Sequence, residues 1–409
     1  MTRAAEDAKK ELLDCFCARF ATGRQAACDL VFASAPGRVE LAGNHTDHQG
    51  GLAIAAAIDR RAWGLSALNG TDEIHVLMDG FGEARFRIDE LEAREDERGT
   101  SVSLIRGMAH AYVCSGKVLR GFDMAVCSDV PVGSGVSSSA AFEMLVGISI
   151  RALCGGPDEA VADSTALALD GVQAEREHFG KPCGAQDQLA SATGGIVAMD
   201  FSDEVPKLFP IDFDASSSGY ALCLIDTRCD HSEHIDEYAA IAHDMVAVAR
   251  LFGCARLRDV GYETFLDRLS EIRADLGDRR ALRALHYFEE TRRVRKQEQA
   301  LRSDDFVSFL ELARMSGASS AQYLQNVSPA SDGSGKRQPA MIVLALCAHL
   351  LGDRGAWRIH GGGFGGSVLC FVPLDEADSF TSSMNNLLGY SACSLVSISP
   401  QGAQTKRLF

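Results

Sequence analysis

The strongest constraint on this chain is a run of small residues that leads directly into a helical pattern. Residues 130–141 read VPVGSGVSSSAA and continue into the helix-period sequence FEMLV. Small residues let backbone amides close around an anion, and serines at a helix start cap the helix and supply hydroxyls. The segment therefore predicts a loop that holds the phosphates of a nucleoside triphosphate. Its expected contact residues are Gly133, Ser134, Gly135, Val136, Ser137, Ser138, Ser139 and Ala140.

A plain turn with a helix cap is the alternative for this loop. The three consecutive serines and the small residues before them favour the phosphate site. A Walker A loop does not compete, because Gly116-Lys117, Gly180-Lys181 and Gly335-Lys336 each lack the upstream glycine and the following Ser or Thr. The phosphate loop must therefore be of another kind.

A second glycine-rich segment, Gly361–Gly366, formally matches the dinucleotide pattern GxGxxG. That pattern needs a strand before it and a helix after it. Here the residues that follow, Val368–Val372, are typical of a strand. We therefore expect a glycine hairpin that approaches a phosphate or another loop closely.

A third segment, residues 35–51, reads APGRVELAGNHTDHQGG. It crowds Arg, Asn, His and Asp onto what we expect to be a glycine-bounded loop, and these side chains offer donors and acceptors for sugar hydroxyls. The alternatives are an ordinary surface loop, or a metal site begun by His45 and His48.

Two acids flank a Gly/Pro turn in the segment 173–188. Glu175 precedes the turn and Asp187 follows it, so one stretch of chain could aim both carboxylates at a single cleft. Each could equally be a solvated surface charge. His231 and His234 have a spacing that is not standard for a metal site, and we expect a loop or helix-cap role for them.

Length and composition limit the class of protein. With 409 residues, the chain is long enough for two domains with a ligand cleft between them, and we divide it at 1–205 and 206–409. A formal charge of −16 argues against nucleic acid. The 13 cysteines are odd in number and form no CxxC pair, which favours free thiols in a reducing cytoplasm. The charged N-terminus lacks the apolar stretch typical of a signal peptide. We expect no membrane-spanning segment, no membrane partner, and a monomer or weak oligomer.

Strand-like and helical runs alternate irregularly, which predicts an α+β fold. Strands are expected at residues 31–32, 63–68, 73–78, 85–88, 220–226, 356–359 and 367–373. Helices are expected near the N-terminus and at residues 101–115, 138–153, 163–179, 233–252, 262–275, 280–301, 306–315 and 338–351.

The three motifs, in this order and at this spacing, resemble those of the GHMP kinases, and the segment 35–51 is similar to the one specific to galactokinases. The resemblance spans nearly the whole chain and implies a two-domain α+β fold with its active site in the interdomain cleft. It implies transfer of the ATP γ-phosphoryl group to the anomeric hydroxyl of a galactose-like sugar, with Mg2+ as cofactor. It implies Asp187 as base with Arg38 beside it, and Ser139 and Glu175 as magnesium ligands. The implied sugar contacts are Asn44, His45, Asp47, Gly184 and Tyr238.

The chain departs from the family at two positions four residues apart. The family usually has Asn where this chain has Glu40, and Glu where it has Asn44, a position that contacts a hydroxyl remote from the reacting carbon. The sugar could therefore be galactose, galactosamine, N-acetylgalactosamine or arabinose. A catalytically silent sensor of ATP and galactose is the alternative from another class.

Overall fold

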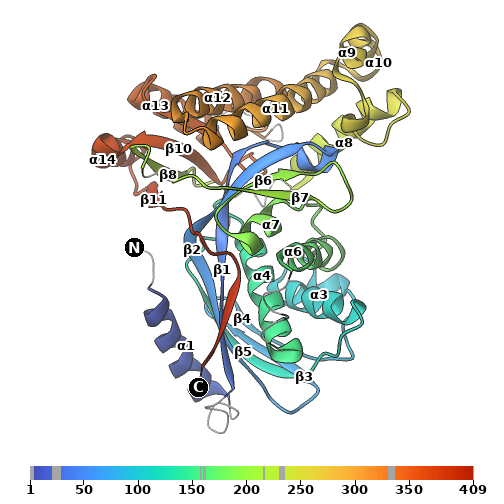
Figure 1. Cartoon of the computed structure of the whole chain (residues 1–409), viewed down its shortest axis with the longest axis vertical. Helices are drawn as coiled ribbons and strands as arrows, with labels where there is room; N and C mark the ends of the chain where they lie inside the picture. Colours follow the sequence, from blue (N-terminus) through green and yellow to red (C-terminus); the bar gives the residue numbers. More distant parts are fainter. Residues whose placement is uncertain are drawn as a thin grey trace.

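The computed structural model describes residues 4–20, 29–156, 159, 163–214, 217–229, 235–329 and 337–408. An eight-stranded sheet forms the lower part of the molecule in Figure 1. Its strands follow the order β12 (Gln404–Leu408), β1 (Leu30–Ala42), β2 (Leu52–Leu68), β5 (Phe122–Ser128), β3 (Glu73–Met78) and β4 (Gly82–Arg87). β6 (Ile196–Asp200) pairs with β2, and β7 (Lys207–Ile211) pairs with β6. All these pairs are antiparallel except β3 with β5.

Helices cover both faces of this sheet. One face carries α3 (Ser101–Cys114), α4 (Ser138–Ile150), α6 (Ser164–Gln173) and α7 (Gln186–Thr193), and the other carries α1 (Ala5–Arg19) (Figure 1). α1 packs one face because Ala8, Leu12 and Phe16 recur every four residues and are all buried. The segment Ser138–Gly155 is long and apolar enough to cross a membrane by length and composition, yet 72% of it is buried inside the protein. It forms the centre of the core, between the sheet and the neighbouring helices.

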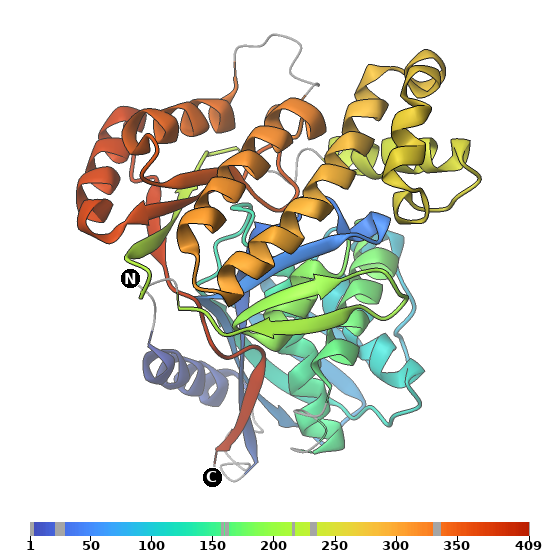
Figure 2. The ribbon, with the colours of Figure 1, turned by 45° about the horizontal axis from the view of Figure 1, so that its top comes forward.

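A second, four-stranded antiparallel sheet has the order β11 (Cys393–Val396), β8 (Tyr220–Asp226), β10 (Ser367–Pro373) and β9 (Ala356–Ile359). It packs with α12 (Phe306–Ser319), α13 (Pro339–Leu351) and α14 (Ala377–Leu388). The other α-helices within the described residues are α8 (Ile235–Leu251), α9 (Tyr262–Asp267), α10 (Leu269–Leu276) and α11 (Asp278–Arg302). Figure 2 shows α11 lying across the end of the first sheet, where it contacts β1, β2 and β7.

The two sheets are not strictly separated along the chain. The expected boundary at 205/206 lies between β6 and β7, which pair with each other. The last strand, β12, returns to pair with β1. The first sheet thus takes strands from both sides of that boundary, and the division into 1–205 and 206–409 stays a prediction.

Most of the expected elements are confirmed, with one informative error. The motif 35–51 was expected to be a loop, but its first half, Ala35–Ala42, belongs to β1. Irregular pairing with β2 between Pro36 and Arg38, and again between Glu40 and Ala42, explains how proline and glycine fit within this strand. The functional side chains of this half are therefore carried on a rigid strand. His231 and His234 lie outside the described residues.

Candidate active site

Arg38 of β1 and Asp187 in the first turn of α7 form an ion pair. Arg38 Nε donates to Asp187 Oδ1 at 2.7 Å and Nη2 donates to Oδ2 at 2.8 Å, a two-pronged pairing. The hydroxyl of Ser137 also donates to Asp187. Burial opposes ionisation of this carboxyl, but Arg38 and Ser137 hold the pKa of Asp187 below its usual value. Asp187 is thus an ionised carboxylate at neutral pH.

The glycine–serine loop before α4 has the conformation of a phosphate cradle. Gly133 and Gly135 have φ values of 74° and 78°, and Ser137, which precedes the helix, has a φ of 59°. The expectation that Ser137 caps α4 is wrong, because its side chain makes no cap bond and turns to Asp187. The first amides of α4 therefore keep free donors for an anion.

The three sequence motifs meet at this loop. Arg38 Nη1 donates to the carbonyl oxygen of Gly135 at 2.7 Å, and Ser367 Oγ donates to that of Ser134 at 2.7 Å. A Cβ on Gly366 would lie 3.2 Å from the backbone of Gly135, so the glycine hairpin closes directly onto the loop. The prediction that Gly361–Gly366 approaches another loop closely is confirmed.

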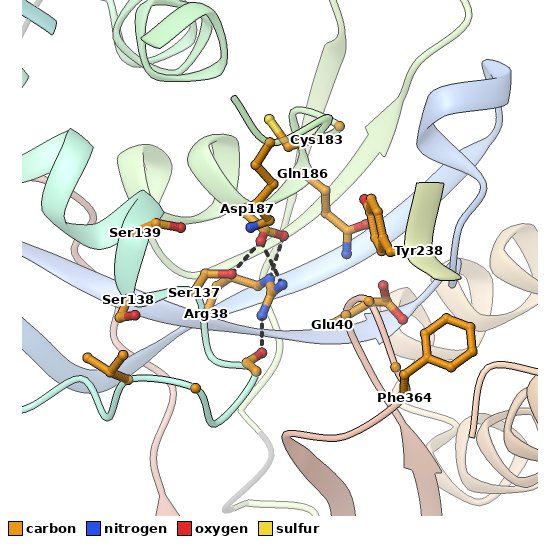
Figure 3. A pocket seen from close by; sticks show the side chains of 18 of the residues that line it. Arg38, Glu40, Ser137, Ser138, Ser139, Cys183, Gln186, Asp187, Tyr238 and Phe364 are labelled. Atoms are coloured by element: carbon orange, nitrogen blue, oxygen red, sulfur yellow. Dashed lines mark hydrogen bonds and ion pairs between the residues drawn. The ribbon is translucent and has the colours of Figure 1, made fainter. Parts of the chain in front are cut away.

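A cavity of about 410 Å³ opens where these segments meet, within the size range of small-molecule sites (Figure 3). Most of the expected site residues line it: Arg38, His45, Asp47, Gly133, Gly135, Ser137, Ser138, Ser139, Gly184, Asp187 and Tyr238. Ser134 and Val136 of the loop and Ala140 of α4 do not line it, and Glu175 and Asn44 are buried outside its lining. Lining residues without a role expected from the sequence include Glu40, Lys181, Gln186 and Phe364.

Ser139 lines the cavity and Glu175 lies behind it, and both offer hard oxygen ligands. Ser139 Oγ donates to Glu175 Oε1 at 2.9 Å, and Lys181 Nζ lies 3.0 Å from the same oxygen. Burial works against ionisation, but the ammonium of Lys181 lowers the pKa of Glu175. A hydroxyl and an ionised carboxylate this close together fit Mg2+, which prefers oxygen ligands.

A second buried carboxyl group, that of Glu143, is linked to Glu175 through Gln188 and was not expected from the sequence. Gln188 Nε2 donates to Glu175 Oε2 at 2.9 Å and to Glu143 Oε2 at 3.0 Å. Burial and the nearby Glu175 raise the pKa of Glu143 well above its usual value, so this second group is a neutral acid. The sequence signal for Glu143 is its position as the single acidic residue within the apolar run of α4.

His45 lies at the far side of the cavity in a left-handed conformation, with a φ of 58°. Its Nε2 lies 3.0 Å from the carbonyl oxygen of Gly362, which requires the hydrogen on Nε2 and leaves Nδ1 as an acceptor. Burial, with help from His48, lowers the pKa of His45 to about 3, so the ring is neutral. The ring of Tyr238 packs against it with centroids 4.9 Å apart.

Asp47 and Gly184 come from different motifs and touch in the cavity wall. Asp47 Oδ1 accepts from the backbone amide of His48 at 2.9 Å. A Cβ built on Gly184 would lie 1.5 Å from Asp47 Oδ2. Position 184 therefore excludes any side chain while Asp47 keeps this orientation.

Asn44 does not line the cavity and is completely buried. Its Nδ2 donates to Glu40 at 3.0 Å and to the carbonyl oxygen of Gly361 at 2.7 Å. Its Oδ1 accepts from Asn326 at 2.8 Å and from Ser320 at 3.2 Å. Both hydrogens and both lone pairs of the Asn44 amide are used inside the protein, so the amide has no group left for a sugar hydroxyl. The expected sugar contact of Asn44 stays a prediction.

Comparisons with known proteins agree with this arrangement. The family model of the galactokinase galactose-binding signature matches residues 15–66, and that of the GHMP kinase N-terminal domain matches residues 103–195. A galactokinase of Actinobacillus pleuropneumoniae is 31% identical over 361 residues, covering 86% of this chain and 87% of the relative. A galactokinase of Glaesserella parasuis is 30% identical over 364 residues, covering 84% and 86%.

Solved structures show the same fold. Lactococcus lactis galactokinase, crystallised with galactose, superposes with a TM-score of 0.81 at 22% identity, over 97% of this chain and 99% of that one. The Methanococcus jannaschii mevalonate kinase gives a TM-score of 0.62 at 14% identity, over 90% and 98%. With three converging motifs, the two family matches and relatives at about 30% identity over most of its length, the chain belongs to the galactokinase family of GHMP kinases.

Proposed function

We propose that this protein transfers the γ-phosphoryl group of ATP to the anomeric hydroxyl of galactose, producing galactose 1-phosphate and ADP. The observation that carries the proposal is the Arg38–Asp187 pair, which lies between the serines of the glycine–serine loop and Tyr238 (Figure 3). His45 and Asp47 line the same cavity. The galactokinase relatives and the galactose-bound Lactococcus lactis structure support the same choice of sugar.

Asp187 accepts the proton of the sugar hydroxyl as its oxygen attacks the γ-phosphorus. The carboxylate is ionised before the reaction because Arg38 and Ser137 hold its pKa low, so it has a free charge with which to take the proton. Arg38 is fixed by three hydrogen bonds and offers positive charge where negative charge builds up on the transferring group. The protein mainly positions the reactants and stabilises charge.

The phosphates of ATP lie along the loop from Gly133 to Ala140, held by its backbone amides and the N-terminus of α4. Ser139 and Glu175 would hold Mg2+, which would supply neutralisation of the phosphate charge. Lys181 lines the cavity beside Glu175 and adds a second positive charge on that side.

Galactose lies at the opposite end of the cavity. His45 offers an acceptor nitrogen, Asp47 offers carboxylate oxygens, and Tyr238 offers a ring face and a hydroxyl. Gly184 leaves room for the sugar next to Asp47. We also propose a cytoplasmic location, since the cysteines of the described residues form no disulfide.

A sugar panel tests the proposal. Galactose, galactosamine, N-acetylgalactosamine and arabinose are incubated with ATP and Mg2+, ADP release is coupled to a spectroscopic readout, and the product is examined by ³¹P and ¹H NMR. We expect galactose to give the highest kcat/KM and a phosphate on the anomeric carbon. Binding of galactose and ATP without turnover of any sugar would instead identify a silent sensor.

A further inference from the structure

Two polar side chains in the wall of the sugar end have unused hydrogen-bonding capacity. They are Glu40 on β1 and Gln186 at the start of α7, and both line the cavity. Both are almost completely buried, at 2% and 5% exposure. Buried polar atoms that keep hydrogen-bonding capacity beside a cavity are candidates for contact with a ligand.

The carboxylate of Glu40 is anchored through one oxygen. Oε1 accepts from Arg358 Nη2 at 2.5 Å and from Asn44 Nδ2 at 3.0 Å. Among the residues that the structure describes, Oε2 has only the long contact with Asn44 at 3.3 Å. A carboxylate oxygen can accept two hydrogen bonds, so Oε2 keeps room for a donor from the cavity.

Gln186 contributes the complementary group. Its Nε2 has no hydrogen-bond partner in the described part of the chain. Because Gln186 and Asp187 are neighbours in the first turn of a helix, their side chains diverge by roughly 100°. Figure 3 shows the Gln186 amide reaching toward Tyr238, away from the Arg38–Asp187 pair and on the side where Glu40 lies.

The spacing of Arg38 and Glu40 along β1 indicates how far Glu40 lies from the reacting end of the sugar. Arg38, which holds Asp187, and Glu40 are two residues apart on one strand. Side chains at this spacing share a face and are separated by roughly 6.6 Å along the strand. That separation is similar to the span of a pyranose ring, so a sugar with its anomeric hydroxyl at Asp187 has its opposite end at Glu40.

We propose that Glu40 and Gln186 together recognise one hydroxyl at the end of the sugar ring opposite the anomeric carbon, on C4 or C6. The hydroxyl donates to Glu40 Oε2 and accepts from Gln186 Nε2. This inference rests on the proposed function and deepens it, because it names the residues that select the sugar. Glu40 thus supplies the carboxylate that Asn44, with its amide fully used inside the wall, does not supply.

Charged side chains from three elements lie near Glu40. Burial raises the pKa of Glu40 to about 7, opposed by Arg358 of β9 and Arg38 of β1 and assisted by Glu290 of α11. Binding of a hydroxyl donor stabilises the ionised form. Recognition by Glu40 therefore weakens as this group becomes protonated.

The test combines site variants with deoxy sugars. Wild type, Glu40→Gln and Gln186→Leu are assayed for kcat/KM with galactose, 4-deoxygalactose and 6-deoxygalactose. With galactose, Glu40→Gln is expected to lose roughly 10- to 100-fold, the strength of a hydrogen bond to a charged group, and Gln186→Leu roughly 2- to 10-fold. With the deoxy sugar that lacks the recognised hydroxyl, both variants should match wild type within about 3-fold.

Glu40→Gln removes the charged partner of Arg358, so a loss of activity in this variant can come from a loss of stability. Gln186→Leu breaks no ion pair and therefore tests the proposal independently. Removing a buried donor without a described partner should leave the melting temperature unchanged or raise it, even as kcat/KM for galactose falls. Glu83→Gln, at an exposed site on β4, is the matched control and should change neither value. The KM for ATP should stay at the wild-type value in all three variants.

Equal losses with galactose and with both deoxy sugars would overturn the inference, because the two residues would then support the wall without contacting the sugar. If Gln186→Leu keeps the wild-type kcat/KM for galactose, the proposed contact of Gln186 with the sugar is wrong. Absence of any turnover of galactose by the wild type would refute the proposed function itself, which is a different result.

Discussion

Replacing Arg38 is expected to change the pH at which the enzyme loses activity as well as its rate. Arg38 holds Asp187 through bonds of 2.7 and 2.8 Å and is itself buried. In Arg38→Met the carboxylate keeps the hydroxyl of Ser137 but loses its charged partner. Its pKa should rise, so that acidification protonates the base at a higher pH than in the wild type.

The size of the change follows from the geometry. Both oxygens of Asp187 lose a charged partner at 2.7 and 2.8 Å, which raises the pKa of this carboxyl. Because 32% of the Asp187 side chain is exposed, solvent screens part of the effect. Loss of the positive charge near the transferring phosphoryl group should also reduce kcat by about 100- to 1000-fold.

The assay is the pH dependence of kcat for wild type, Arg38→Met and Arg38→Lys. The acid limb should move to higher pH in Arg38→Met and stay closer to the wild-type position in Arg38→Lys, which keeps a positive charge without the two-pronged geometry. An acid limb that does not move in Arg38→Met would refute the idea that Arg38 keeps Asp187 ionised.

Three further changes test other parts of the site. Gly184→Ala would place a methyl group 1.5 Å from Asp47 Oδ2, so galactose binding should weaken by about 1–3 kcal/mol while the KM for ATP is unchanged, as isothermal titration and initial rates would show. Glu175→Gln should raise the Mg2+ concentration needed for half-maximal rate by at least about tenfold, and an unchanged requirement would remove Glu175 as a ligand. Because burial raises the pKa of Glu40 to about 7, the KM for galactose should increase as the pH falls from about 8 to about 6, and Glu40→Gln should abolish this trend.

The sequence predicted most of the helices and the strands with strong patterns. It missed β6, β11 and β12, because these short strands pair with strands far away along the chain. It also missed β7, a short and mostly exposed strand that pairs only with β6. Pairing partners of this kind are set by the tertiary fold and leave little local signal. The same limit explains why Ala35–Ala42 was expected to be a loop: Pro36 and Gly37 hide a strand whose irregular pairing accommodates them.

Within the site, motif order identified the residues that converge on the cavity, including Arg38 and Asp187, which are 149 positions apart. It did not separate residues in the wall from those behind it. Glu40 and Asn44 lie four positions apart in one motif, and only the three-dimensional contacts show that the first lines the cavity while the amide of the second is fully used.

Replacing Asp187 by Asn tests the proposed proton transfer most directly. The amide keeps the size of the side chain but cannot serve as the base, so galactose binding measured by titration calorimetry should stay within a few-fold of wild type. Single-turnover formation of galactose 1-phosphate should fall by about 100-fold or more. Near-normal turnover in Asp187→Asn would contradict the assignment of Asp187 as the group that accepts the proton.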